Sequence, residues 1–530
     1  MTSSLSGYIL KLSKLSKFFI IWRWIILENC SSHSASGTCP ERYPSFFKKP
    51  VPITDIASVK DYDIVVIGAG SPGVPCALKA AEEGARVALI QKEPEAAACG
   101  NFGAGIDITR SDPADVESLV SLLMAVSAHR PKRELIETWA KNSGEALQWL
   151  IKRSQEAGAQ VVDMGTAAHS GLLKKHSWDI QFFTCVFGPK PYDTGAAMKA
   201  LCTMAQQKGV HIFYNTPAEQ LVQDKDGTVT GVIARGEEGH IQFRASRGVV
   251  VATGDYANDK EMMDYYLPDV TNLELKRTGR TGDGHKMILW AGGCMENVGH
   301  TKMCHDMDAG PTSFMDAPFM RVKLNGRRFC NETVHMELMN CYLLSKEDRG
   351  NYCEIFDSAY LDKTAGWGMQ LDDKESLKNW MPEEKVERKG VVENLIRTYK
   401  TDTLEELAGK LDIQDVPAFI KTVKTYNAFA AAGKDSQYGV PAKFLTPVDT
   451  PPYYGIHRHI RFTVGCSGVE VNEKLQCLNA EGRPIPGLYA IGNLAGNFYG
   501  GADYPLDVLG LNLGHNYTEG YVVAKELTGC

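Results

Sequence analysis

Three glycines near the start of the chain have the spacing of a turn that binds a dinucleotide. Gly68, Gly70 and Gly73 lie in VVIGAGSPG, between residues 64–67, which predict a strand, and residues 74–83, which predict a helix. In such a turn the first glycine permits the tight bend, the second lets a pyrophosphate approach the backbone, and the third lets helix and strand pack closely. The N–H groups and dipole at the helix start favour the phosphate charge. The flanking elements favour a dinucleotide over the alternative, a glycine-rich turn without a ligand.

A predicted βαβ unit positions this turn. Gly84 ends the helix, and residues 87–90 predict the second strand. Gln91 and Lys92 follow that strand, where such folds usually carry an acid that binds the adenosine ribose hydroxyls. Because a glutamine amide both donates and accepts hydrogen bonds, we expect Gln91 to bind a ribose hydroxyl. How strongly this position discriminates against a phosphate stays open.

The composition excludes some classes of protein and favours small-molecule chemistry. The chain has 530 residues, enough for two or three domains around a large site. Its net charge of −7 provides no basic field for nucleic acid. The 14 cysteines form no CxxC pair, which argues against a local zinc or iron–sulfur site. We expect no nucleic-acid partner, no metal, and mostly buried, reduced thiols in a reducing compartment.

Residues 1–58 differ from the rest of the chain and are predicted to be an N-terminal extension. Lys11, Lys14 and Lys17 precede an apolar run at residues 18–27 that Arg23 interrupts. This run is shorter than the about 20 residues that cross a bilayer, so we expect no stable membrane insertion. The alternatives are a poorly ordered extension, a weak leader, an interfacial anchor, or upstream sequence from a mis-assigned start. We expect a cytoplasmic protein, with export or membrane association through this segment as the alternative.

Later segments predict one domain built from both ends of the orderly sequence. Residues 59–292 and 447–530 carry strands and glycine-rich turns, including a tight turn at Asp226-Gly227, a buried strand at residues 249–252 and a last helix at about residues 513–527. Residues 293–446 are richer in Met, Cys and aromatic residues and predict an inserted domain. The fold class expected is α/β, with an inserted α+β domain.

Four further blocks carry a resemblance to a known family. They are VVVATGDYAND, GRTGDGHKMILWAGG, LNGRRFCNE and GLYAIGNLAG. With the glycine turn, they resemble the flavoprotein superfamily of soluble fumarate reductases and 3-ketosteroid dehydrogenases, from Asp61 to the C-terminus. The resemblance implies a Rossmann-like FAD-binding domain (GR2-type) with an inserted α+β capping domain, and a flavin that carries the hydride.

The resemblance also implies the residues that bind FAD. They lie in the glycine turn, after the second strand, in the middle of the chain before the Asp226-Gly227 turn, in the VVVATGDYAND and TGDG blocks and near the C-terminus: Gly68, Gly70, Ser71, Gly73, Gln91, Lys92, Ala218, Thr253, Gly254, Asp283, Gly492, Asn493 and Leu511. Asn493 stands where an acid is commoner. Because no second glycine turn of this kind is present, we expect no NAD(P)H site and a separate electron donor or acceptor, either a protein or a carrier.

The substrate residues of fumarate reductases are absent. The family's proton-donating Arg lies four residues after the Glu of the RFxNE motif, and Met336 stands there. The neighbouring His335 is the candidate acid, although a surface His is the plain alternative. Arg461 and Phe462 precede Thr463 where the family has a substrate-binding His. A dicarboxylate substrate is therefore disfavoured.

Tyr504-Pro505, before a glycine-rich turn, resembles the ketone-binding pattern of ketosteroid dehydrogenases. There a Tyr hydroxyl and a glycine N–H, matched best by Gly510, bind the ketone oxygen, although two extra residues separate them here. Two such donors stabilise the enolate that forms when hydride reaches an enone. A core tyrosine is the alternative for Tyr504.

Apolar residues of the inserted domain would suit a flat ligand or form ordinary core: Phe314, Met315, Phe319, Met320, Met336, Met339 and Tyr342. His300 and His305 could face a cleft or form a small network. We predict a small apolar ketone as substrate, with reduction of the C=C bond of a 3-oxo-Δ4 steroid or bile-acid intermediate, as in bacterial bile-acid 5α-reductases. The alternatives are the reverse dehydrogenation, a fumarate- or urocanate-type reductase, and a flavin electron carrier.

Overall fold

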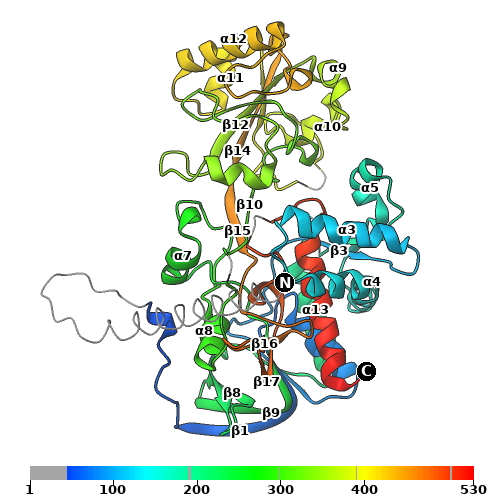
Figure 1. The fold of residues 1–530 in the computed structure, drawn as a ribbon, viewed down its shortest axis with the longest axis vertical. Helices are drawn as coiled ribbons and strands as arrows, with labels where there is room; N and C mark the ends of the chain where they lie inside the picture. The colour runs from blue at the N-terminus through cyan, green and yellow to red at the C-terminus, as the bar shows by residue number, and fades with distance from the viewer. Residues whose placement is uncertain (1–43, 189–192, 298, 389–390, 502–503) are drawn as a thin grey trace, which may run out of the picture. The chain divides into compact units, whose positions relative to one another are not determined.

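The chain was studied as a computed structural model (Figure 1). The structure describes residues 44–188, 193–297, 299–388, 391–501 and 504–530. Contacts divide the chain into two units, Met1–Ser45 and Phe46–Cys530, and the second unit is described below. The predicted extension, 1–58, falls largely on residues 1–43, outside the described residues. The domain boundaries at 292/293 and 446/447 stay predictions.

A mixed sheet with a parallel centre forms the base of the fold. Strand β1 (Ile56–Ile67), helix α2 (Gly73–Glu82) and strand β2 (Val87–Ile90) form the predicted βαβ unit. Strand β1 also pairs in parallel with β9 (Gly239–Val251), which pairs with β17 (Pro484–Ala490), while β2 pairs with β6 (His211–Phe213). Strands β16 (Gln476–Leu478), β7 (Ala218–Gln223) and β8 (Val229–Gly236) add antiparallel edges. The central strands are buried on both faces, as in parallel sheets covered by helices.

Strand β1 is longer than the sequence predicted. The expected strand covered residues 64–67, but pairing with β9 begins at Ile56 opposite His240. Residues 56–62 are mostly exposed, so they lack the apolar pattern of a buried strand. Their strand conformation depends on the partner, which a local pattern does not reveal.

Four parallel strands end at the same level of the sheet. Ile67 of β1 lies opposite Ile90 of β2 and Val251 of β9, and Ala490 of β17 also lies opposite Val251. The loops that follow these strands therefore meet at one edge. In open parallel sheets, ligands bind at this carboxyl edge.

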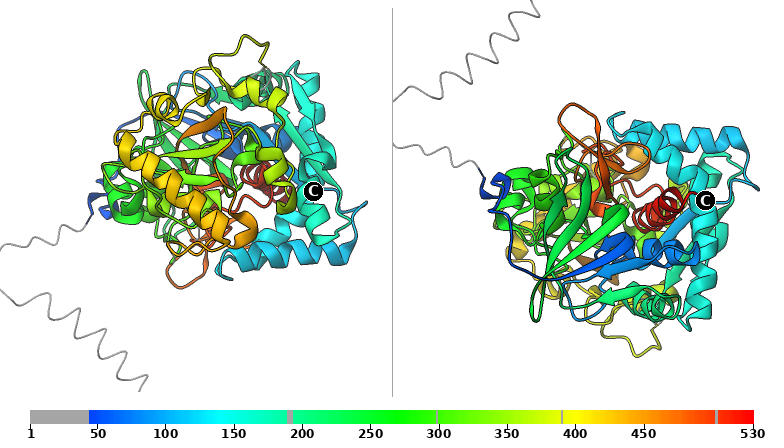
Figure 2. Two further views of the ribbon diagram at one scale, coloured as in Figure 1. Left: turned by 90° about the horizontal axis from the view of Figure 1, so that it is seen from above. Right: turned by 90° about the horizontal axis from the view of Figure 1, so that it is seen from below.

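The last helix lies against this edge and against a second, smaller sheet. Helix α13 (Leu511–Thr528) packs on α2, on α4 (Arg133–Glu156) and on strand β3 (Phe102–Ile106), as Figure 2 shows. Strand β3 pairs with β5 (Phe182–Phe187), which pairs with β4 (Val161–Asp163). Helices α3 (Pro113–Val126), α5 (Ser170–His176) and α6 (Thr194–Gln207) complete this region. No helix in the described ranges is long and apolar enough to cross a membrane.

An inserted region carries its own four-stranded antiparallel sheet, in the order β11-β12-β14-β13. The strands are Met320–Val322, Asn351–Asp357, Tyr453–His459 and Thr398–Thr401, and the helices are α9 (Tyr360–Lys363), α10 (Lys374–Leu377), α11 (Leu404–Lys410) and α12 (Val416–Ala432). The chain enters through β10 (Lys302–His305) and leaves through β15 (Arg461–Gly465), which pair with each other. Helices α7 (Lys260–Tyr266) and α8 (Asp283–Trp290) precede β10.

Separate hydrophobic clusters fill these regions. Six of the apolar residues considered for a ligand surface are core instead: Phe314, Met315, Phe319, Met320, Met336 and Met339. Tyr342 is 39% exposed. Each cysteine within the described ranges is a free thiol, and most are buried.

Candidate active site

The glycine turn is shaped by backbone contacts that leave no space for side chains. Gly68 has φ +107°, and a Cβ there would lie 2.5 Å from the carbonyl oxygen of Ala252. A Cβ on Gly73 would lie 1.9 Å from the carbonyl oxygen of Gly68. The first and third glycines are therefore required by the bend and by close helix–strand contact. At Gly70 a Cβ would lie 3.3 Å from the carbonyl oxygen of Ala97, a milder conflict.

Gln91 is tied to this turn. Its Oε1 accepts the N–H of Ala69 at 3.3 Å, and its Nε2 donates to the carbonyl of Glu95 at 3.0 Å. The amide has a second N–H and a second lone pair, so binding of a ribose hydroxyl stays compatible with these bonds. Ala218, at the start of β7, lies two residues after Thr216, whose N–H donates to the carbonyl of Gln91 at 2.9 Å.

An ion pair joins the end of β2 to the TGDG segment. Lys92 Nζ lies 2.9 Å from Asp283 Oδ2 and 2.7 Å from Thr281 Oγ1. Burial alone would raise the pKa of Asp283, but hydrogen bonds from Lys92 and Thr281 lower it below its ordinary value. Lys92 is thus placed by Asp283, and the two predicted cofactor residues lie together.

Unpaired polar atoms at the carboxyl edge fit a hydroxyl- and phosphate-rich cofactor. Thr253 Oγ1 is buried and has no hydrogen-bond partner among the described residues. Asn516 Oδ1 is likewise buried and unpaired, and a Cβ on Gly492 would lie 3.2 Å from it. Next to Thr253, Gly254 has φ +73° and open space where a Cβ would point. Because buried polar atoms are normally paired, these atoms indicate a ligand such as FAD.

Tyr504 and Gly510 meet at the start of α13. The Tyr504 hydroxyl accepts the backbone N–H of Asn512 at 3.0 Å, and Gly510 is the N-cap residue of the helix, with φ +85°. Burial raises the pKa of Tyr504, so the hydroxyl keeps its proton. The oxygen accepts from Asn512 while the O–H remains a donor. The helix thus brings the two residues predicted to bind a ketone to one place.

Asn512 connects this place to the cofactor residues. Its Nδ2 donates to Asn493 Oδ1 at 2.8 Å and to Cys466 Sγ at 3.2 Å. Gly492 donates its N–H to Glu519 of α13 at 2.6 Å, and Leu511 is the first helical residue and is buried. Ser71 is buried in the glycine turn. Helix α13 therefore contacts Gly492 and Asn493, predicted for FAD, as well as Tyr504, predicted for the ketone.

The two candidate histidines have very different surroundings. The side chain of His335 is 62% exposed and lies 3.6 Å from Asp316. His300 is buried: the Tyr256 hydroxyl bonds to its Nδ1, Tyr266 stacks on the ring at 4.3 Å, and its Nε2 has no partner among the described residues. Burial lowers the pKa of His300 to about 4. The sequence left the role of His300 open, and no local signal revealed the two tyrosines that hold it.

The segment of His300 runs beside that of Tyr504. Lys302, two residues after His300, accepts the Tyr504 N–H at 3.2 Å, and Thr301 Oγ1 accepts the N–H of Gly501 at 3.0 Å. A neutral His300 that accepts the Tyr256 O–H at Nδ1 carries its own proton on Nε2. Such a group can donate a hydrogen bond, and it can pass its Nε2 proton to a substrate carbon while Nδ1 takes up the proton of the Tyr256 hydroxyl.

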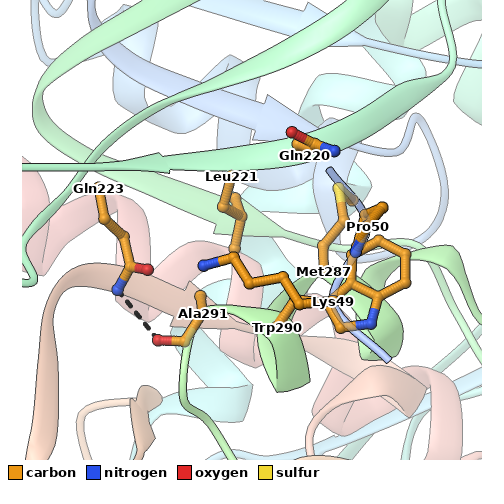
Figure 3. A pocket seen from close by; sticks show the side chains of 8 residues that line it. All are labelled: Lys49, Pro50, Gln220, Leu221, Gln223, Met287, Trp290 and Ala291. Carbon is orange, nitrogen blue, oxygen red and sulfur yellow. Dashed lines mark hydrogen bonds between the residues drawn. The ribbon is translucent and has the colours of Figure 1, made fainter. Parts of the chain in front are cut away.

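Other features of the surface lie away from these residues. A hollow between β7, α8 and the segment at residues 49–50 is lined by Pro50, Leu221, Gln223, Trp290 and Ala291, among others (Figure 3). None of the predicted site residues lines it, and we assign it no chemistry. In the described part of the chain, no group of three His, Cys, Asp or Glu residues is placed to hold a metal ion.

Comparisons with known proteins give the same fold and cofactor. Vinyl phenol reductase of Lactiplantibacillus plantarum is 26% identical over 484 residues, which cover 84% of this chain and 93% of that protein. A probable fumarate reductase of Shewanella frigidimarina is 26% identical over 528 residues, covering 89% and 80%. The structure of 3-ketosteroid-Δ4-(5α)-dehydrogenase from Rhodococcus jostii has a TM-score of 0.63 and 20% identity, covering 90% of this chain and 98% of that one. This likeness confirms the predicted fold class.

The cofactor follows from the family. The sequence matches the FAD binding domain family over residues 63–504, most of the chain. This range begins just before the glycine turn and ends at Tyr504. The chain therefore belongs to the FAD binding domain family and is an FAD-dependent oxidoreductase.

Proposed function

We propose that the protein reduces the activated C=C bond of a small, neutral ketone, with a 3-oxo-Δ4 steroid or bile-acid intermediate as the best candidate. The observation that carries this proposal is the buried Tyr504 hydroxyl at the start of α13, held by the N–H of Asn512 at 3.0 Å. FAD bound in its reduced form would supply the hydride from N5. Two of the relatives are named for vinyl phenols and 3-ketosteroids, and these names support an aromatic or ketonic substrate.

Tyr504 and Gly510 bind the ketone oxygen in this proposal. When hydride reaches the β-carbon, negative charge develops on that oxygen. A hydroxyl that is already oriented by Asn512 stabilises this charge without reorganisation. Because burial raises the pKa of Tyr504, the group acts as a donor and not as a base.

The α-carbon then needs a proton, for which the chain offers two candidates. His300 is buried, oriented by Tyr256 and bonded through its neighbours to the segment of Tyr504. His335, the acid proposed from the sequence, is mostly exposed and lies against Asp316. The surroundings favour His300, with His335 as the second candidate.

A dicarboxylate substrate fits less well. Met336, at the position of the family's acid, is fully buried, and the Tyr352 hydroxyl lies 3.6 Å from its sulfur. Arg461, which follows β14, bonds to Asp308 at 2.9 Å. Met336 carries no charge and Arg461 is already paired with Asp308, so neither side chain supplies a free cation for a carboxylate.

We also propose a separate electron donor and a cytoplasmic location, as expected from the sequence.

A panel of acceptors tests this function. The FAD-loaded protein is reduced under anaerobic conditions and mixed in a stopped-flow instrument with a 3-oxo-Δ4 steroid, a vinyl phenol, urocanate and fumarate. Fast reoxidation of the flavin by the steroid supports the proposal. Reoxidation only by urocanate or fumarate supports a fumarate- or urocanate-type reductase, and reoxidation by none of the four supports an electron carrier. The reverse dehydrogenase predicts that the saturated ketone reduces the oxidised flavin.

A further inference from the structure

One face of α13 is polar although it is buried. Asn512, His515, Asn516 and Glu519 follow the i, i+3, i+4, i+7 spacing of a single helix face. All four are less than 10% exposed. This face contacts Asn493 and Gly492, and it therefore borders the carboxyl edge where FAD binds.

His515 is held in one orientation on this face. Its Nδ1 lies 3.0 Å from Glu519 Oε1, and the other carboxylate oxygen of Glu519 accepts the N–H of Gly492 at 2.6 Å. Because a carboxylate only accepts hydrogen bonds, a neutral imidazole in this position carries its proton on Nδ1. Phe498 stacks on the ring at 4.4 Å, and Tyr499 approaches it edge-on at 5.4 Å.

The other ring nitrogen of His515, Nε2, lies in the interior of the protein. His515 Nε2 is buried and has no hydrogen-bond partner among the described residues, although the ring is only 2% exposed. A buried polar atom of this kind is costly unless something else bonds to it. Glu519 fixes the acceptor at Nε2, and the same carboxylate binds Gly492, a predicted cofactor residue.

We propose that His515 is a further FAD-binding residue, with Nε2 accepting a hydrogen bond from a donor of the cofactor. FAD offers such donors in its ribityl hydroxyls and in the N–H of its flavin ring. Glu519 is the positioning residue that keeps Nε2 free to accept. The inference rests on FAD binding, which the family establishes, and not on the proposed substrate.

Two amide variants separate Nε2 from the rest of the ring. The amide of H515Q reaches the position of Nε2, whereas the amide of H515N reaches only that of Nδ1 and can still bond to Glu519. Apoprotein of each variant is titrated with FAD, and the dissociation constant is read from the quenching of flavin fluorescence. We expect H515N to weaken FAD binding about tenfold, the effect of one buried hydrogen bond, and H515Q to stay within about threefold of the wild type.

His457 provides a matched control. It is a buried histidine of β14, 3% exposed, whose Nε2 bonds to Asn351 at 3.1 Å. H457N removes a comparable bond in the inserted region, so it should lower thermal stability without changing FAD affinity. Two results would overturn the proposal: unchanged FAD affinity in H515N, or equal weakening in H515N and H515Q. The second would mean that Nε2 bonds to an internal water or that only ring packing matters. Neither result bears on the acceptor panel, which uses the wild-type protein.

Discussion

Replacing Tyr504 with Phe removes one oxygen and tests two roles of that oxygen. The first role is structural: the hydroxyl accepts the N–H of Asn512 at 3.0 Å, near the start of α13, where helix N–H groups have no partner within the helix. Losing this acceptor leaves a buried N–H unpaired, which costs about 1–3 kcal/mol of folding free energy. The second role is chemical. Removing one donor to a developing oxyanion costs about 10²–10³ in rate, or about 2.7–4 kcal/mol.

Anaerobic stopped-flow reoxidation of the reduced flavin by a 3-oxo-Δ4 steroid measures the chemical role, and thermal unfolding measures the structural one. Y360F is the matched control, because the Tyr360 hydroxyl is likewise bonded to the backbone, here as the donor to the carbonyl of Asp372 at 2.6 Å, but in the inserted region. We expect Y504F to slow hydride transfer at least a hundredfold with FAD still bound, and Y360F to leave the rate unchanged. A Y504F rate within about threefold of the wild type would refute the oxyanion role.

Three further predictions concern the glycine turn, the residue that protonates the substrate, and the dependence of stability on pH. G73A should yield protein that has lost FAD and unfolds at lower temperature, because its Cβ would lie 1.9 Å from a backbone oxygen. The control G171A, which has open space at its Cβ, should keep its FAD. Equal FAD content in the two variants, measured by absorbance, would contradict this prediction. H300Q should slow reoxidation by about 10²–10⁴ and H335Q should not, and the reverse order would restore His335 as the acid. Burial lowers the pKa of His285 to about 3, so the unfolded state binds more protons below pH 6.5 and stability falls as pH drops toward 3. H285L should remove up to about 1.4 kcal/mol of that loss per pH unit, measured by denaturant unfolding at pH 7 and pH 5, and an unchanged slope would show that His285 does not carry it.

Elements with local signals were predicted well. The βαβ unit matches β1, α2 and β2 at the glycine turn, because apolar runs and glycines mark its boundaries. The turn at Asp226-Gly227 lies between β7 and β8, and Gly227 has φ +85°, as such a turn requires. The last helix begins at Leu511, two residues before the predicted start, because Gly510 caps it and the apolar pattern begins later.

Features that depend on distant partners were not predictable in the same way. Strand β14 pairs with β12 and β13, from segments far apart in the sequence. The contacts of His300 could not be predicted, because Tyr256 lies in the loop before α7 and Tyr266 at the end of α7. The bond between Tyr504 and Asn512 also needed the structure, because two extra residues before Gly510 left the match to the family pattern ambiguous.

The polar face of α13 shows why residue composition alone would predict a helix exposed to solvent. Asn512, His515, Asn516 and Glu519 would ordinarily indicate a surface exposed to water, because burying such groups is costly unless they are hydrogen-bonded. In the structure they are buried, and the bonds to Gly492 and Asn493 satisfy only part of them. Two of their atoms, His515 Nε2 and Asn516 Oδ1, have no hydrogen-bond partner among the described residues. A bound cofactor that supplies the missing partners would offset this cost, which is the physical reason for proposing that the polar face of α13 is part of the FAD site.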